Sequence, residues 1–340
     1  MKPYEANYRE LSAALAVSSR RGLPMIVTGT LFWLFKKKEK TGMPKIVPHF
    51  WYDKEAKETA EFYASLFESS KIVYTHVIKN PPPYDDAEAV SFELAGQPFV
   101  ALSAGPYFKL NPAISLIVSC STAGEVDKLW AALSEGGKEL MALGEYPFSK
   151  RYAWVGDRYG LSWQLMLAEG GQEAQKITPC LLFSGDARGK AEEAVRYYAE
   201  VFANSKIGSI CRYGEGEAEA PGAKVNYASF TLDGVAFAAM DNGTDADYTF
   251  SEAFSFIVNC KDQKEIDDFW EKLSAVPDAE SCGWCKDRFG VAWQVLPSNW
   301  EEICYSGTEE QQWRVNEAML AMKKIDVETL ERAKREISGA

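Results

Sequence analysis

Histidine and glutamine side chains are the first candidates for chemistry in this sequence. Only two histidines occur, His49 and His76, which severely limits any histidine-based metal site or catalytic triad. Two glutamines, Gln164 and Gln294, each directly follow a tryptophan inside an apolar stretch of strand length. Because neighbouring side chains of a strand point to opposite faces, we expect each tryptophan to pack under helices and each glutamine to face a cleft.

The sequence around these glutamines occurs twice. Three blocks return later in the chain: WVGDRYGLSWQLML (154–167) as WCKDRFGVAWQVLP (284–297), ISLIVSC (114–120) as FSFIVNC (254–260), and FYASLFESSKI (62–72) as YYAEVFANSKI (197–207). The offset between copies changes from block to block, so loops differ in length while the elements are kept. The pattern predicts a duplicated domain of about 125 residues, with copies at 44–168 and 177–300.

Each copy contains two similar units. In the first unit, KIVPHFWY predicts a strand, KEAKETAEFYASLF an amphipathic helix, and three further strands follow before residue 104. The order then restarts at residue 114, so four strand-helix-three-strand units are expected in the whole chain. A unit with one helix covers only one face of its sheet, and two units can therefore curl their open faces around a shared cleft. The Asp-Arg-aromatic-Gly run before each Trp-Gln pair is interpreted as a hairpin turn, with the Asp or Arg holding the loop.

Charge and cysteine content narrow the class of protein. The net charge is −12, which argues against a nucleic-acid partner because phosphate repels an acidic protein. There are seven cysteines and no secretory signal pattern, so we expect a cytoplasmic protein with free thiols. Cys282 and Cys285 form a Cys-Gly-Trp-Cys, but this motif leads into a hairpin, whereas thioredoxin-like motifs open a helix.

The two ends of the chain differ from the repeats. Residues 1–43 contain one apolar run, 23–35, which is shorter than the about 20 residues that a bilayer-spanning helix needs. We expect no stable membrane span there and treat these residues as an N-terminal extension outside the fold. Residues 301–340 space apolar side chains at helical intervals and predict a C-terminal helical tail that docks on the domains or on a partner chain.

The motifs PHFWYD, FVALSAGPYFKLNPAISLIVSC and WVGDRYGLSWQL resemble the PhnB-like branch of the vicinal oxygen chelate superfamily, also described as 3-demethylubiquinone-9 3-methyltransferase-like. This resemblance implies an α+β fold in which tandem paired βαβββ modules form open mixed β-sheet barrels, the glyoxalase fold. Single-domain members commonly form homodimers, so the tandem chain is expected to pair internally as a pseudo-dimer or to form a homodimer. The superfamily includes enzymes and non-catalytic binders, so the resemblance leaves the activity open.

The resemblance also implies a position for a divalent metal, held by one side chain each from strands one, four, five and eight. In the first copy these positions are His49, Ser103, Ser115 and Gln164. In the second copy they are Cys180, Asp241, Ser255 and Gln294. Neither set completes a typical site, and only His49 and Gln164 are retained as candidate metal ligands. We therefore expect the functional cleft in the first copy.

The candidate ligand-binding residues are His49, Trp51, Ser103, Phe108, Asn111, Gln164, Asp241 and Gln294. The favoured function is binding of a small molecule in the cleft between modules. A metal-dependent lyase, isomerase or dioxygenase is the first alternative, and a catalytically silent assembly domain is the second. A methyltransferase that uses S-adenosylmethionine is not expected, because no strand is followed by the glycine-rich loop of such a site.

Overall fold

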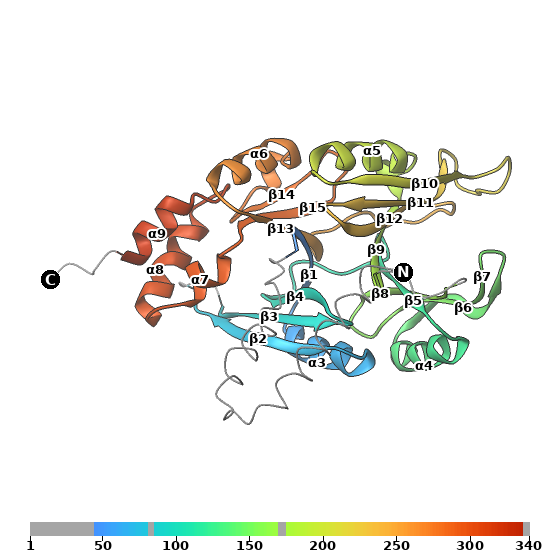
Figure 1. The fold of residues 1–340 in the computed structure, drawn as a ribbon, viewed down its shortest axis with the longest axis horizontal. Helices are drawn as coiled ribbons and strands as arrows, with labels where there is room; N and C mark the ends of the chain where they lie inside the picture. Colours follow the sequence, from blue (N-terminus) through green and yellow to red (C-terminus); the bar gives the residue numbers. More distant parts are fainter. Residues whose placement is uncertain (1–43, 81–84, 169–174, 336–340) are drawn as a thin grey trace, which may run out of the picture. The chain divides into compact units, whose positions relative to one another are not determined.

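The computed structural model describes residues 44–80, 85–168 and 175–335, and these contain two mixed β-sheets (Figure 1). The N-terminal extension predicted at 1–43 lies outside the described residues.

Four modules of similar order follow one another along the chain, and the expected three strands after the helix are present in the first three, whereas the fourth has two. The first comprises β1 (Ile46–Tyr52), α3 (Ala56–Leu66), β2 (Lys71–Ile78), β3 (Ala87–Leu94) and β4 (Gln97–Ser103). The second comprises β5 (Ile114–Cys120), α4 (Ala123–Ser134), β6 (Lys138–Tyr146), β7 (Ser149–Gly156) and β8 (Ser162–Leu167). The third comprises β9 (Ile177–Phe183), η1 (Gly185–Ala187), α5 (Ala191–Val201), β10 (Lys206–Arg212), β11 (Val225–Leu232) and β12 (Val235–Asp241). The fourth comprises β13 (Phe254–Cys260), α6 (Gln263–Leu273), η2 (Pro277–Ala279), β14 (Trp284–Lys286) and β15 (Ala292–Pro297).

The modules pair between the two copies of the repeat. The seven-stranded sheet has the order β14-β15-β13-β1-β4-β3-β2 and joins the first module to the fourth. The eight-stranded sheet has the order β10-β11-β12-β9-β5-β8-β7-β6 and joins the second module to the third. Antiparallel pairs β1–β13 and β5–β9 make these joins. The expectation that each copy would form its own cleft is therefore corrected, because the two modules of one copy lie in different sheets.

Burial follows the position of each strand. The central strands β5, β9 and β13 are buried at every residue, whereas the edge strand β2 alternates between exposed and partly exposed residues. Trp163 and Trp293 lie in the core at 0% and 1% exposure, as the Trp-Gln pattern predicts. Trp163 packs on Tyr63 of α3, and Trp293 packs on Tyr198 of α5.

Asp157, in the hairpin turn between β7 and β8, joins the two sheets. Its Oδ2 accepts hydrogen bonds from the Tyr63 hydroxyl at 2.7 Å and from Trp163 Nε1 at 2.9 Å. Its Oδ1 accepts from the backbone N–H groups of Tyr159 and Leu161 at 2.9 and 3.0 Å. Since Tyr63 belongs to the seven-stranded sheet's module, this one carboxylate holds the turn and ties it to the other sheet.

Asp287 makes the same contacts in the second copy. It accepts from Tyr198 at 2.7 Å, from Trp293 Nε1 at 2.8 Å, and from the backbone of Phe289 and Val291 at 2.8 and 3.1 Å. Burial raises the pKa of both aspartates above the usual value, while the hydrogen bonds act in the opposite direction. The Asp-Arg-aromatic-Gly motif is thus a hairpin turn, as predicted, and its Asp connects neighbouring modules.

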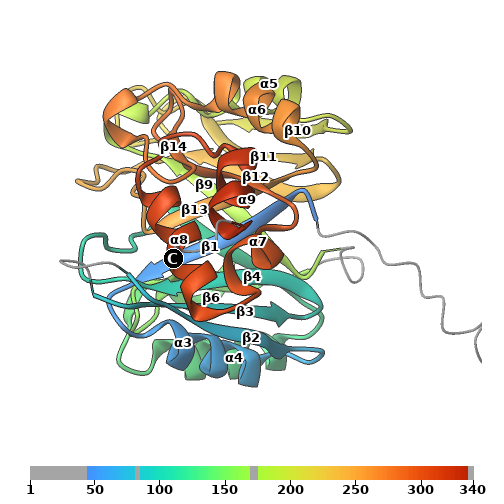
Figure 2. The same ribbon diagram turned by 90° about the vertical axis from the view of Figure 1, so that its left-hand side faces the viewer.

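Three helices complete the described fold: α7 (Trp300–Tyr305), α8 (Glu309–Leu320) and α9 (Val327–Arg335). In Figure 2 they lie in front of β1 and β4. Just before the edge strand β14, the backbone N–H groups of Cys282 and Gly283 donate to the carbonyls of Met322 and Lys323 at 2.8 and 2.7 Å. No helix in residues 44–80, 85–168 and 175–335 is long and apolar enough to cross a membrane.

Candidate ligand-binding cavity

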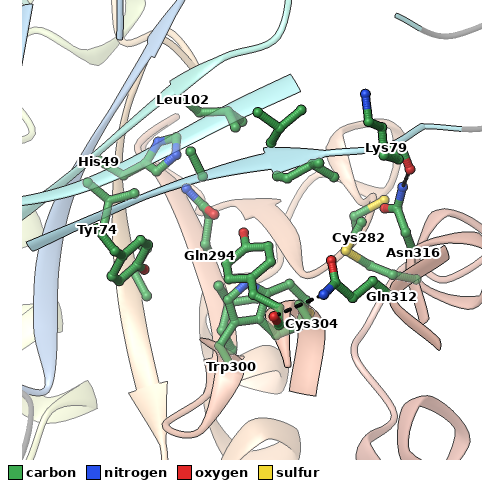
Figure 3. Close-up of a pocket in the computed structure, with 18 of the residues that line it drawn as sticks. His49, Tyr74, Lys79, Leu102, Cys282, Gln294, Trp300, Cys304, Gln312 and Asn316 are labelled. Carbon is green, nitrogen blue, oxygen red and sulfur yellow. Dashed lines mark hydrogen bonds between the residues drawn. The ribbon is translucent and has the colours of Figure 1, made fainter. Parts of the chain in front are cut away.

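A cavity of about 170 Å³ lies between the seven-stranded sheet and the C-terminal helices (Figure 3). The sheet contributes the side chains of His49, Val100, Leu102, Ile257, Gln294 and Leu296. The helices contribute Trp300, Cys304, Tyr305, Glu309, Gln312, Trp313, Asn316 and Met319, and Lys79 follows β2. Most of these side chains are apolar or aromatic, so the wall favours an apolar molecule with few polar groups.

His49, Ser255 and Gln294 form a polar cluster in the sheet at this cavity. Gln294 Nε2 donates to Ser255 Oγ at 3.0 Å, and Ser255 Oγ lies 3.3 Å from His49 Nδ1. Ser255 is fully buried, and its hydroxyl lies within hydrogen-bond reach of Nδ1. When the serine donates to Nδ1, the imidazole proton is on Nε2. The cluster therefore offers one N–H donor, from His49, and one free acceptor, Oε1 of Gln294.

His49 is held in its neutral form. Burial lowers the pKa of His49 to about 3, because water is excluded from the charged imidazolium. Trp284 contacts the ring edge-to-face with 5.3 Å between ring centroids and helps to exclude water. At neutral pH this end of the cavity is accordingly polar but uncharged.

The C-terminal helices close the cavity along β2. Tyr305 of α7 stacks on His76 with the ring centroids 4.4 Å apart. Asn316 of α8 donates from Nδ2 to the Lys79 carbonyl at 2.8 Å. Its Oδ1 is buried and accepts no hydrogen bond from the described residues. Together with the contacts to Cys282 and Gly283, these interactions attach the helices at both edges of the seven-stranded sheet.

The eight-stranded sheet carries a corresponding cluster. Gln164 Nε2 donates to Ser115 Oγ at 2.7 Å, as Gln294 does to Ser255. Cys180 occupies the place of His49 and is fully buried. Oε1 of Gln164 accepts a hydrogen bond from the Tyr152 hydroxyl at 2.8 Å. A more open hollow of about 220 Å³ on this sheet is lined by Ile117, Met166, Tyr227 and neighbours.

The structure brings His49 together with Gln294 and separates it from Gln164. The reason is topological, since β1 pairs with β13 of the fourth module while β8 lies in the other sheet. The expected pairing of His49 with Gln164 in one cleft is corrected accordingly. Ser115, which the resemblance placed beside His49, lies in the eight-stranded sheet, and Ser255 takes that place.

Ser103 and Asp241 lie at equivalent strand ends and hold helix starts. Ser103 Oγ accepts from the backbone N–H of Ala56 at 2.9 Å. Asp241 is fully buried and accepts from four backbone N–H groups, of Gly189, Ala191, Lys224 and Val225. Their hydrogen bonds are used within the fold, and neither side chain lines the cavity.

The remaining candidates lie near the linker between β4 and β5. Trp51 Nε1 donates to the Gly105 carbonyl at 2.8 Å, and the Trp51 ring packs edge-to-face on Phe108 and on Trp284. Asn111 donates to the carbonyl of Thr249 at 2.9 Å and so joins the linkers of the two copies. These residues support the region behind Trp284, and a direct role in ligand binding stays a prediction.

The metal site implied by the superfamily does not fit the donor set. With the observed pairing, the strands in question are β1, β4, β13 and β15, which present His49, Leu102, Ser255 and Gln294. Leu102 offers no donor atom, and Ser255 already bonds Gln294 and His49. Within residues 44–80, 85–168 and 175–335 no group of three His, Cys, Asp or Glu side chains is placed to hold a metal. Transition metals prefer three or four such donors.

Sequence reasoning named Ser255 only as a position of the implied metal site and Cys282 only within the Cys-Gly-Trp-Cys motif, and it missed Tyr152 and the helical wall of the cavity. The signal was present in the alignment of the copies, because Tyr152 stands two residues before Trp154 and Cys282 two before Trp284. Tyr152 is a buried residue of β7, whereas Cys282 lies in the turn before β14 with a φ of +52°, so the two copies differ in side-chain volume and in backbone at this spacing.

The fold defines a tandem protein of four similar modules, in which each of the two mixed sheets takes one module from each copy. Residues 44–166 and 175–296 both match the model of the family described as 3-demethylubiquinone-9 3-methyltransferase. These matches cover most of the sequence, and the chain belongs to this family.

The chain is also similar to several solved structures. A PhnB protein from Bacillus cereus is 39% identical over 36% of this chain and 99% of its own, with a TM-score of 0.34. A Staphylococcus aureus protein is 30% identical over 37% of this chain and 98% of its own, with a TM-score of 0.16. Glyoxalase I from Zea mays is 11% identical over 75% of this chain and 94% of its own, with a TM-score of 0.47. A search of the curated proteins found no match.

Proposed function

We propose that the cavity on the seven-stranded sheet binds one small, uncharged and largely apolar molecule. The observation that carries this proposal is a cavity of about 170 Å³ with mostly apolar walls and the polar cluster His49–Ser255–Gln294 on the sheet. Lys79, Glu309, Gln312 and Asn316 are the further polar residues that line it. An apolar cavity of about 150 Å³ in a protein core accepts a molecule the size of benzene. The ligand is accordingly expected to be one ring or a short chain in size.

The uncharged cluster on the sheet favours a neutral group of the ligand at that end of the cavity. His49 is neutral because burial lowers its pKa to about 3, and Ser255 and Gln294 carry no charge. A charged group placed against this cluster would lose its hydration without gaining an ion pair, which is costly. Two acceptor atoms in the wall, Oε1 of Gln294 and Oδ1 of Asn316, accept no hydrogen bond from the described residues, which favours a ligand that donates.

The burial and hydrogen bonding of Ser255 and the low pKa of His49 favour binding over catalysis. Ser255 is fully buried and is engaged by Gln294 and His49, so it is poorly placed to attack a substrate. A histidine with a pKa of about 3 is a weak base at neutral pH. The methyl transfer in the family's description is not carried over, because a cavity of about 170 Å³ is too small for a nucleoside-containing methyl donor together with an acceptor. A cytoplasmic location and a homodimer stay predictions.

The test uses a matched pair of cavity-filling variants. Leu102 lines the cavity, and Met240 stands at the corresponding place on the eight-stranded sheet, one residue before Asp241 as Leu102 is before Ser103. Isothermal titration calorimetry would follow toluene, phenol and benzoate added to the unmodified protein, to Leu102→Trp and to Met240→Trp. We expect the two neutral compounds to bind the unmodified protein and Met240→Trp, and none to bind Leu102→Trp. Binding that survives in a folded Leu102→Trp protein would contradict the proposal.

A further inference from the structure

The eight-stranded sheet carries a phenol of its own beside its glutamine. Tyr152 comes from β7, is 4% exposed, and donates its hydroxyl hydrogen to Oε1 of Gln164 at 2.8 Å. The phenol ring is enclosed by Tyr146 and Phe148, whose centroids lie 5.5 and 5.0 Å from it. Burial raises the pKa of Tyr152, so the phenol keeps its proton and stays a donor. This position therefore holds a neutral aromatic hydroxyl against the amide oxygen.

The seven-stranded sheet lacks this phenol. Trp154 pairs with Gln164 across β7 and β8, and Trp284 pairs with Gln294 across β14 and β15 in the same register. Two residues before each tryptophan stand Tyr152 and Cys282. Cys282 lines the cavity and is far smaller than tyrosine. In the described part of the chain no group donates a hydrogen bond to Oε1 of Gln294.

We infer that the ligand of the cavity is a small phenol, whose hydroxyl donates to Oε1 of Gln294 as the Tyr152 hydroxyl does to Oε1 of Gln164. This inference rests on the proposed function, and it adds the chemical class of the ligand. The amide oxygen, its orientation by a buried serine and the apolar surroundings are shared by the two sheets. The tyrosine of one sheet thus shows which group the other sheet is built to receive.

His49 completes the recognition of a hydroxyl group. Its counterpart Cys180 is a weak hydrogen-bonding group, whereas His49 carries a proton on Nε2 when Nδ1 accepts from Ser255. A phenol oxygen can accept from this N–H while its own hydrogen goes to Gln294. An ether such as anisole can only accept, and toluene can do neither. A cavity of about 170 Å³ accommodates a single ring with a small substituent and excludes larger ring systems.

The experiment compares phenol, anisole and toluene by isothermal titration calorimetry on the full chain. We expect phenol to bind about five- to tenfold more tightly than toluene, because one buried hydrogen bond is gained. Gln294→Met should remove this preference while toluene still binds. Gln164→Met is the matched control, since the same change in the eight-stranded sheet should leave the preference intact. Cys282→Tyr should abolish binding of all three compounds by supplying an internal phenol.

The outcomes separate this inference from the proposed function. If phenol and toluene bind equally well and Gln294→Met changes nothing, the cavity binds small molecules but the phenol assignment is overturned. If none of the compounds binds the unmodified protein, both proposals are overturned. Tyr152→Ala gives a second readout, because the vacated place beside Gln164 should bind phenol and raise the stoichiometry from one to two. A folded Tyr152→Ala protein with a single binding site would contradict the equivalence of the two positions. If Cys282→Tyr does not fold, the comparison of Gln294→Met with Gln164→Met decides whether the ligand is a phenol.

Discussion

The hydroxyl of Tyr63 on α3 donates a hydrogen bond to Oδ2 of Asp157 at 2.7 Å, and this contact joins a helix on the seven-stranded sheet to a hairpin of the eight-stranded sheet. Tyr198 and Asp287 repeat it at 2.7 Å in the second copy. Modules that follow each other within one copy lie in different sheets, and these two buried pairs hold them together.

Loss of this contact should destabilise the fold. Tyr63→Phe keeps the ring in the core but leaves the buried Asp157 carboxylate with one hydrogen bond fewer, at a cost of about 1–3 kcal/mol. Tyr198→Phe should cost a similar amount because its surroundings are the same. Urea unfolding measures the change, with Tyr107→Phe as the control, since Tyr107 is 74% exposed and should change by less than about 0.5 kcal/mol. Three equal, small effects would contradict the role of the buried pairs.

The free energy of unfolding should decrease as the pH is lowered, and His49 should contribute to this decrease. Burial lowers the pKa of His49 to about 3 in the folded state from 6.5, the value expected when the chain is unfolded. Between these values the unfolded chain binds a proton that the folded protein does not, so stability is full above pH 6.5 and is lost as pH falls towards 3. The loss approaches about 1.4 kcal/mol per pH unit for this one proton.

His49→Gln isolates this contribution because other titrating groups are unchanged. The difference in unfolding free energy between the unmodified protein and His49→Gln should shrink as the pH is lowered from 7 to 5, as measured by urea unfolding at each pH. His76→Gln is a control of the same kind at an edge strand. A difference that stays constant with pH would show that His49 is not held neutral by burial.

The repeats, the module order and the face of each Trp-Gln pair could be predicted from the sequence, because periodicity and burial specify which side of a strand is apolar. The partner of each module could not. The pairs β1–β13 and β5–β9 are made by backbone hydrogen bonds, which leave no mark on residue types. His49 was for this reason assigned to Gln164, although Gln294 lies beside it. The resemblance placed Ser103 and Asp241 at the strand-four position of the implied metal site, but a polar side chain at a strand end can also hold a helix start, as both do here.

Removal of the C-terminal helices should open the cavity. A chain that ends at Asn299 lacks Trp300, Tyr305, Trp313 and Met319, and the apolar face of the seven-stranded sheet then meets water. We expect a lower melting temperature or a change of oligomeric state, together with loss of ligand binding. Differential scanning calorimetry and analytical ultracentrifugation measure the two effects. Glu328→Ala, at an exposed residue of α9, is the control that should change neither. An unaltered truncated chain would show that the helices are dispensable.

Docking of these helices depends on Gly283, which lies before β14. Its φ is +85°, and an added Cβ would lie 2.8 Å from Leu296 Cδ2 and 3.0 Å from Ile325 Cγ1. Gly96 has a φ of +78° and nothing within 4 Å of an added Cβ, so Gly96→Ala measures the backbone cost alone. Gly283→Ala should exceed that control by about 1–3 kcal/mol in urea unfolding, because the added methyl group crowds the core. Equal losses of unfolding free energy in Gly283→Ala and Gly96→Ala would mean that the C-terminal segment shifts to accommodate the methyl group at no cost in stability.

Replacing Asp241 or Ser103 tests whether each side chain stabilises the fold or binds the ligand. Asp241 accepts four backbone hydrogen bonds, from Gly189 and Ala191 at a helix start and from Lys224 and Val225 in the loop before β11. Ser103 accepts one, from Ala56. Removing a helix cap costs about 1 kcal/mol, and each additional buried N–H left without a partner adds to that cost.

Asp241→Ala should therefore lower the unfolding free energy by several times the loss that Ser103→Ala causes, which chemical denaturation can measure. Neither variant should change the affinity for a neutral ligand, as far as the protein stays folded, because neither side chain lines the cavity. A drop in affinity at unchanged stability would reverse this assignment and return Asp241 to the ligand site. The expected result, a loss of stability at unchanged affinity, would place the polar recognition of the ligand in the His49–Ser255–Gln294 cluster.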